Sequence, residues 1–207
     1  MNAVLAADGA ACSRPWSGAG PVPADSGLRL LIGGASRQQL RWSPDPDAPA
    51  SRPLGDGELR LAIRWVELSA HDLARPATRA QPETRRGRVD WSPVGAIGCA
   101  EVVESAPGGP SPGRWLLGPL HVGTHRVLHM LSHDADGCIA AQATDAQPPR
   151  QQRYAWIPAL QPRIDVAGPD AVERAVHALR ERSPRGENRV RLSLCAAISA
   201  THLQAPG

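Results

Sequence analysis

The clearest chemical pattern in the sequence is a row of histidines that recurs at every fourth position: His121, His125, His129 and His133. On a helix, two histidines four residues apart can share one metal ion. On a strand, four residues span about 13 Å at ~3.3 Å each, which one metal with bonds of ~2 Å does not bridge. We interpret this stretch as a strand. We therefore assign no metal ligands and expect all four imidazoles on one face, exposed or lining a groove.

An acidic motif, Asp134-Ala135-Asp136-Gly137, follows the histidine row. It resembles the start of a calcium loop, but no glutamate occupies the bidentate position that the EF-hand pattern requires. We predict a hairpin turn whose glycine can adopt a positive φ. The sequence also has no G-x-S-x-G elbow that would single out a nucleophilic serine. No catalytic residue is assigned.

Four cysteines are distributed over the chain: Cys12, Cys99, Cys138 and Cys195. No two are close in sequence and no C-x-x-C motif is present, which argues against a zinc ribbon and a thioredoxin-type site. Four cysteines allow three disulfide pairings, between which the sequence does not choose. We favour four buried free thiols, and we predict no cofactor.

The elements that would position these residues are mainly strands. Residues 58–68 alternate between apolar and polar side chains, the pattern of a half-buried strand, and residues 96–104 form a second expected strand. Residues 120–147 contain no proline, which favours a core hairpin because proline is excluded from central strands.

The C-terminal part differs from the rest because its pattern predicts a helix between two strands. A possible strand at Ile164–Val166 precedes a helix that Gly168-Pro169-Asp170 opens, because proline suits the first helical position and an acid suits the helix N-terminus. A clean alternating strand follows at residues 189–194. The size fits a compact strand–helix–strand unit. Its first turn has no glycine-rich phosphate loop, so we do not predict nucleotide binding.

Residues 115–141 combine a Trp-led strand, a Leu-x-x-Gly-x-His-x-Val motif and an Asp-x-x-Gly turn. This combination resembles the second half of bacterial immunoglobulin-like β-sandwich modules. The matching positions are Trp115, Leu120, Gly123, His125, Val127, Asp134 and Gly137. The resemblance covers about 40 residues if residues 96–104 are included. It implies a fold far more than a function. Leu128, Met130 and Leu131 depart from the β-branched residues usual in such modules, which leaves the strand register open.

Composition narrows the function classes. The 23 basic residues are all arginine, and the chain has no phenylalanine, one tyrosine and six tryptophans, a skew typical of GC-rich codon usage. The arginines are dispersed from Arg14 to Arg191 rather than gathered on one face, so we predict no nucleic-acid partner. Tryptophan must supply the large core side chains, and Trp65 and Trp115 are expected to be buried. The alternative for the tryptophans is a carbohydrate-stacking platform.

We predict a mainly β fold, an immunoglobulin-like β-sandwich with a small C-terminal α/β element. Residues 1–27 are expected to form a flexible arm, residues 28–150 the sandwich domain and residues 151–207 the α/β element. No apolar run is long enough for a membrane span and the N-terminus is a poor secretory signal, so no membrane partner is expected. The location stays unknown, with the cytoplasm as the default.

The function that these observations favour is a non-catalytic binding or structural module that acts through protein–protein contacts. One alternative is an accessory domain of an enzyme, or a metal-binding protein, built on the His121–His133 row, which metal analysis of the purified protein tests. Another is a GC-rich reading frame without a selected function, which a cooperative thermal unfolding transition would contradict. The oligomeric state is left open.

Overall fold

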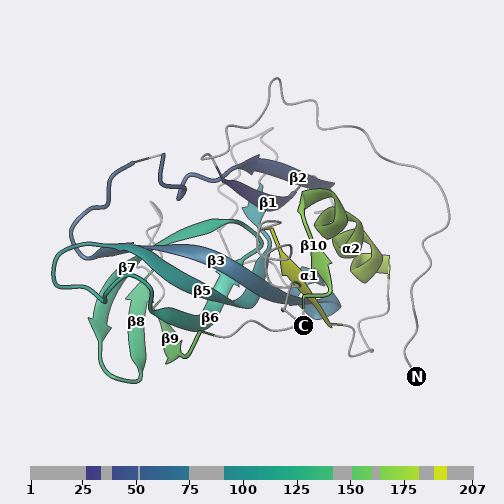
Figure 1. Cartoon of the computed structure of the whole chain (residues 1–207). Coiled ribbons are helices and arrows are strands. Elements are labelled where there is room, and N and C mark those ends of the chain that lie inside the picture. The colour runs from purple at the N-terminus through teal and green to yellow at the C-terminus, as the bar shows by residue number, and fades with distance from the viewer. Residues whose placement is uncertain are drawn as a thin grey trace, which may run out of the picture.

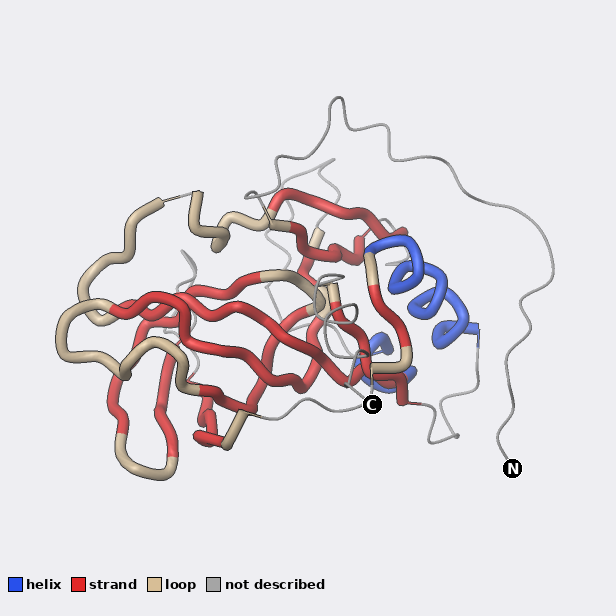
Figure 2. The backbone as a smooth tube through the Cα atoms, in the orientation of Figure 1, coloured by secondary structure: helices blue, strands red, loops and turns tan. Residues whose placement is uncertain are grey.

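The computed structural model describes residues 27–33, 39–50, 52–74, 91–141, 151–159, 164–181 and 189–194. Figure 1 shows the strands wrapping around a barrel, with a helix at one end, and Figure 2 shows how few of the described residues are helical. The predicted arm at residues 1–27 lies, except for Gly27, outside the described part of the chain.

Six strands form a closed antiparallel β-barrel. They are β3 (Glu58–Ser69), β5 (Gly95–Ser105), β6 (Trp115–His121), β7 (His125–His133), β8 (Gly137–Ala141) and β9 (Gln151–Ile157). The ladder runs β3-β5-β6-β9-β8-β7 and then returns, because β7 pairs with β3. The mainly β character is confirmed, but the immunoglobulin-like sandwich is wrong: a sandwich keeps two separate sheets, whereas this ladder closes on itself.

Strand β3 makes the closure possible because it changes partner along its length. Its first half pairs with β7, from Glu58 opposite His129, and its second half pairs with β11 (Arg189–Ser193). The ladder between β3 and β5 has two irregularities, one after Arg60 and one after Ile63. Such irregularities increase strand twist and bend the sheet, which lets one long strand belong to the barrel and to the sheet beyond it.

A smaller three-stranded sheet packs on the barrel. It has the order β2-β1-β4, with β1 (Leu28–Gly33), β2 (Gln39–Pro44) and β4 (Ser92–Pro93). The amide of Leu30 donates to the carbonyl of Val122, and the amide of Thr124 donates to the carbonyl of Leu28, both at 2.8 Å. The small sheet is therefore joined to the connection between β6 and β7 by backbone hydrogen bonds.

The C-terminal unit extends the barrel sheet. Strand β10 (Val166–Ala167) pairs in parallel with β11, and the helix α2 (Pro169–Glu181) lies between them in sequence. Val172, Val176 and Leu179 are buried on one stripe of α2. A second, shorter helix, α1 (Ala70–Ala74), follows β3. Neither described helix has the length and apolar character needed to cross a bilayer. Strand β9 lies beyond residue 150, so the barrel continues past the boundary expected there.

The hairpin of β7 and β8 shows that residues 125–141 are strands joined by a turn. The Oδ1 atom of Asp134 accepts hydrogen bonds from the amides of Asp136 at 2.9 Å and Gly137 at 3.0 Å. Gly137 does not have the expected positive φ. Glycine is required there for another reason, since a Cβ atom would collide with the carbonyl oxygen of Tyr154 on β9.

Aliphatic side chains form most of the core. Leu59, Leu61 and Leu128 are fully buried, as is Tyr154 apart from 1 % of its surface. Trp65 is 9 % exposed, which confirms its predicted burial, whereas Trp115 is only half-buried. The tryptophans thus contribute less to the barrel interior than the composition implies.

Candidate functional site

The histidine row does not form one face. His121 ends β6 and is 4 % exposed, whereas the other three histidines lie on β7, where His125 is half-buried and His129 and His133 are exposed. The expectation of four imidazoles on one face is therefore wrong, because a chain reversal at residues 122–124 separates the first histidine from the rest. Among the described residues, no three metal-ligating side chains come together.

The two described cysteines are buried in the barrel. Both Cys99 and Cys138 are free thiols, and burial raises the pKa of Cys99 to about 12 and that of Cys138 to about 11. A thiol with so high a pKa is a poor nucleophile, because the thiolate is the reactive form. Cys12 and Cys195 lie outside the described residues.

An acid, a hydroxyl and an imidazole meet at Asp45, Thr124 and His125. The Thr124 hydroxyl donates to Oδ2 of Asp45 at 3.2 Å and lies 3.0 Å from Nδ1 of His125. It also accepts from the amide of Leu28 at 3.0 Å. The Asp45 carboxylate accepts the amides of Asp47 and His125 as well. We interpret this group as a clasp that holds the small sheet on the barrel, because its hydrogen-bonding capacity is used within the fold.

The clasp has perturbed protonation equilibria. Burial raises the pKa of Asp45 to about 6, although the amides of Asp47 and His125 and the Thr124 hydroxyl favour the charged form. Burial also lowers the pKa of His125, and the positive charges of Arg60 and Arg64 lower it further. The clasp is therefore expected to respond to pH.

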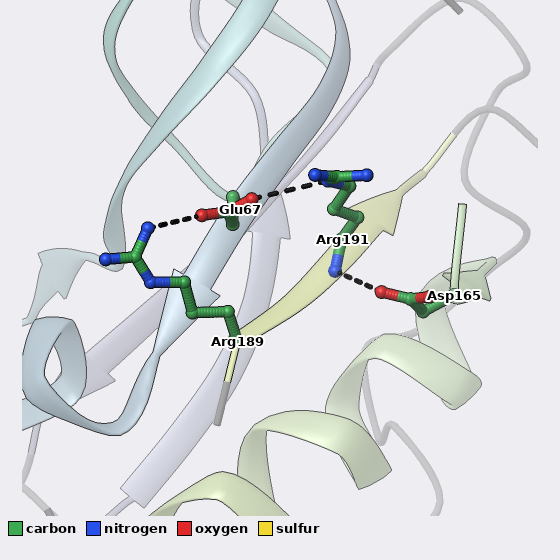
Figure 3. Close-up of a pocket in the computed structure, with 4 residues that line it drawn as sticks. All are labelled: Glu67, Asp165, Arg189 and Arg191. Atoms are coloured by element: carbon green, nitrogen blue, oxygen red, sulfur yellow. Dashed lines mark hydrogen bonds and ion pairs between the residues drawn. The ribbon is translucent and has the colours of Figure 1, made fainter. Parts of the chain in front are cut away.

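A charged depression lies where β11 joins β3 (Figure 3). Glu67 accepts from Nη1 of Arg189 at 2.9 Å and from Nε of Arg191 at 3.3 Å, and Asp165 accepts from the backbone amide of Arg191 at 3.0 Å. Both arginine side chains are exposed. The two positive and two negative groups balance, and exposed ion pairs of this kind contribute about 0.2–1 kcal/mol each. The depression offers a ligand no net charge.

Three basic side chains meet where the small sheet joins the barrel: Arg29 of β1, His121 of β6 and Arg126 of β7. We call these three the basic cluster. Nη1 of Arg126 lies 3.3 Å from Nδ1 of His121, and Arg29 is bridged to Gly123 by an isolated β-pair. A Cβ atom on Gly123 would lie 2.6 Å from Nε2 of His121 and 3.3 Å from Cβ of Arg29. The glycine is therefore the point at which the imidazole and Arg29 approach each other.

Arg126 enters the cluster from inside the barrel. It lies two positions from Leu128 on β7 and directly opposite Leu61 of β3, so alternation places its stem on the interior face. Only 6 % of the residue is exposed. Its positive charge also acts on the buried Tyr154 hydroxyl, where it opposes the rise in pKa that burial causes. The cluster thus extends from the interface of the two sheets into the barrel interior, toward Tyr154.

The imidazole of His121 is neutral at pH 7. Burial lowers its pKa well below the ordinary value, the charges of Arg126 and Arg29 lower it further, and the backbone of His125 opposes this only weakly. A guanidinium only donates hydrogen bonds, so Nδ1 is the acceptor and the hydrogen resides on Nε2. Within the described part of the chain, neither this Nε2 atom nor the buried Nε of Arg29 has an acceptor.

No protein-family model and no curated protein matches this sequence. The function must therefore be argued from the geometry of the basic cluster.

The sequence singled out one of the three members of the cluster, His121, but as part of the histidine row and not as a neighbour of two arginines. The dispersal of arginine along the chain concealed Arg29 and Arg126, because neither lies next to another arginine in sequence. One signal was available for Arg126: in an alternating strand it shares a face with Leu128, which is unusual for an arginine. Nothing in the sequence indicated that β1 would bring Arg29 to the same place.

Proposed function

We propose that this chain is a non-catalytic binding module that takes up a small anion at the basic cluster. One observation supports the proposal above all: two buried donor nitrogens, Nε2 of His121 and Nε of Arg29, have no acceptor among the described residues, and Nδ1 of the same imidazole lies 3.3 Å from Nη1 of Arg126. A buried donor left unsatisfied costs about 1–3 kcal/mol. An anion in contact with these donors removes that cost.

A small ligand fits this site better than a protein side chain. The two donor nitrogens are buried, and His121 is 4 % exposed. An acidic side chain of a protein partner would have to open the interface of the two sheets to reach them. A small anion needs only a displacement of the half-buried Arg29, whose long side chain is flexible. The earlier hypothesis of protein–protein contacts stays a prediction for other surfaces of the chain.

Thermal unfolding of the full chain in a panel of sodium salts at constant ionic strength tests the proposal. We expect the midpoint to rise with the concentration of at least one anion relative to chloride, because a ligand that binds only the folded state stabilises it by mass action. Replacing Arg126 with methionine should abolish the rise. Arg191→Met is the matched control, since it removes a positive charge from the charged depression between β11 and β3 and leaves the basic cluster intact. An equal response to all salts in the wild type would contradict the proposal.

A further inference from the structure

The clasp of Asp45, Thr124 and His125 allows two arrangements of its hydrogen atoms. Oδ2 of Asp45 lies 3.2 Å from Oγ1 of Thr124, which in turn lies 3.0 Å from Nδ1 of His125. We infer, independently of the proposed function, that these groups form a proton relay. A proton taken up by Asp45 turns the Thr124 hydroxyl toward His125 and moves the hydrogen of the neutral imidazole from Nδ1 to Nε2.

With Asp45 charged, the bonding capacity of the threonine fixes every hydrogen position. A hydroxyl donates one hydrogen bond and accepts two, whereas a carboxylate only accepts. The Thr124 hydroxyl therefore donates to Asp45, and one of its lone pairs accepts the amide of Leu28 at 3.0 Å. The other lone pair faces Nδ1 of His125, and a contact at 3.0 Å requires a hydrogen between the two atoms. Nδ1 thus carries the ring hydrogen, and Nε2 is an acceptor.

A proton on Oδ2 of Asp45 reverses both hydrogen bonds. Oδ2 then donates to Oγ1 of Thr124, and the amide of Leu28 still occupies the second lone pair of the hydroxyl. The hydroxyl hydrogen turns to Nδ1 of His125, which has to become the acceptor. The Nδ1 proton passes to water, and Nε2 takes one proton from water. The ring stays neutral, the clasp gains one proton in total, and Nε2 changes from an acceptor to a donor.

The fold confines the hydroxyl to these three partners. A Cβ atom at Gly27 would collide with Oγ1 of Thr124 and lie 3.1 Å from Cβ of Ala48. The segment that leads into β1 therefore closes this side of the hydroxyl, and a water molecule cannot easily take over one of its bonds. A change at Asp45 must then be answered at His125.

The neighbouring charges direct the proton to Asp45 instead of the ring. Burial raises the pKa of Asp45 to about 6 against its hydrogen-bond donors, and the negative charge of Asp47 adds to the rise. Burial lowers the pKa of His125, and the positive charges of Arg60 and Arg64 on β3 lower it further, although Asp47 opposes them. The carboxyl group therefore takes up its proton near pH 6, and an imidazolium beside two guanidinium groups is disfavoured.

The relay can be tested by ¹⁵N NMR of the histidine-labelled full chain between pH 8 and pH 5. A ring nitrogen that carries hydrogen resonates far from one that does not, so the two tautomers and the imidazolium are distinguishable. We expect the hydrogen of His125 on Nδ1 at pH 8 and on Nε2 at pH 5, with a midpoint near pH 6. A ring that gains a second hydrogen instead, or that keeps its hydrogen on the same nitrogen throughout, overturns the relay. The titration contains only chloride salts, so anion binding at the basic cluster is kept out of the result.

Variants assign the exchange to the named groups. Asp45→Asn removes the titrating group, so the hydrogen of His125 should stay on one nitrogen over the whole range. Thr124→Val removes the hydroxyl and should also abolish the exchange, whereas Thr124→Ser retains the hydroxyl and should retain the exchange. Asp47→Asn is the matched control, since it removes a neighbouring carboxylate that lies outside the relay. The exchange should persist there with its midpoint at lower pH, because the charge of Asp47 raises the pKa of Asp45.

Each variant can contradict the relay. An exchange that survives Asp45→Asn assigns the proton to another group, and one that survives Thr124→Val places the hydroxyl outside the path. Loss of the exchange in Asp47→Asn would show that Asp45 is not the group that titrates. If Asp45→Asn or Thr124→Val does not fold, the wild-type titration and the conservative Thr124→Ser variant still decide.

Discussion

The ring of Tyr154 on β9 occupies the space that a side chain at residue 118 of β6 would need, because Gly118 lies directly against it. The ladder between the two strands ends just before this point, with Leu117 opposite Ala155. Beyond it the Tyr154 hydroxyl lies 3.0 Å from the carbonyl oxygen of Pro119 and 2.8 Å from Oε1 of Gln152. An aromatic side chain thus continues the contact between β6 and β9 where their backbone pairing stops.

Gly118→Ala should therefore destabilise the barrel. The added methyl group collides with a ring that is buried among fixed neighbours, and overpacking of this kind costs about 1–3 kcal/mol. Chemical denaturation measures the loss. Gly55→Ala is the control, since its Cβ would meet only the Glu58 side chain, at 3.3 Å, and a change within ~0.5 kcal/mol is expected. Equal effects of the two substitutions would show that Tyr154 does not need the space.

Asp45 should make the protein more stable in mild acid. Its folded-state pKa of about 6 exceeds the 3.8 of an ordinary aspartate, so the native state takes up a proton first as the pH falls. Its contribution to the free energy of unfolding therefore increases between pH 7 and pH 5, by about 1 kcal/mol. Asp45→Asn cannot titrate, so the stability difference between wild type and variant should be larger at pH 5. A difference that is the same at both pH values contradicts the assignment.

His121 should act in the opposite direction. Its folded-state pKa lies below the ordinary value of 6.5, so the unfolded chain takes up the proton first. The stability contributed by the neutral ring is complete above that value and is lost as the pH falls through and below it. We expect His121→Gln to reduce the acid-induced loss of stability in the absence of a binding anion. An unchanged pH dependence in this variant would show that the ring is not buried in its neutral form.

Cys99 and Cys138 should be inert to thiol reagents in the folded protein. Burial and the raised pKa values leave little thiolate at neutral pH. In a Cys12→Ser, Cys195→Ser background, an aromatic disulfide reagent should label two thiols only after denaturant is added. Labelling of either thiol at the rate of a small-molecule thiol in native buffer would mean that the barrel opens far more readily than its packing indicates.

Individual strands and the helix of this fold can be predicted from the sequence, but the closure of the barrel cannot. Alternation predicts the strand at residues 58–68, and the proline at residue 169 marks the start of a helix that the structure contains. The pairing of Glu58 with His129 depends on twist that accumulates at the irregularities after Arg60 and Ile63. No local pattern encodes that twist, so a sandwich and a barrel have the same strand signals.

The candidate site was less predictable than the fold. Its members come from three strands, of which β1 lies far in sequence from the consecutive strands β6 and β7. Two of the members are arginines in a chain whose only strongly basic residue is arginine. An arginine is informative only once its environment is known, and burial of Arg126 follows from the register of β7 against β3. The four-residue spacing of the histidines drew attention to His121 as part of a row on one strand. That row does not exist in the structure, because a chain reversal separates His121 from the other three histidines.

The divided pairing of β3 has a consequence for biosynthesis. This strand is synthesised before both partners of its outer edge, β7 and β11. Until β7 arrives, β3 and β5 form an open hairpin with an exposed edge, which is the state most prone to pairing with other chains. The barrel can close only after β9 has been synthesised, and the second half of β3 stays uncovered until β11 follows. A translational pause between these strands would therefore prolong the period in which the nascent chain is open to aggregation.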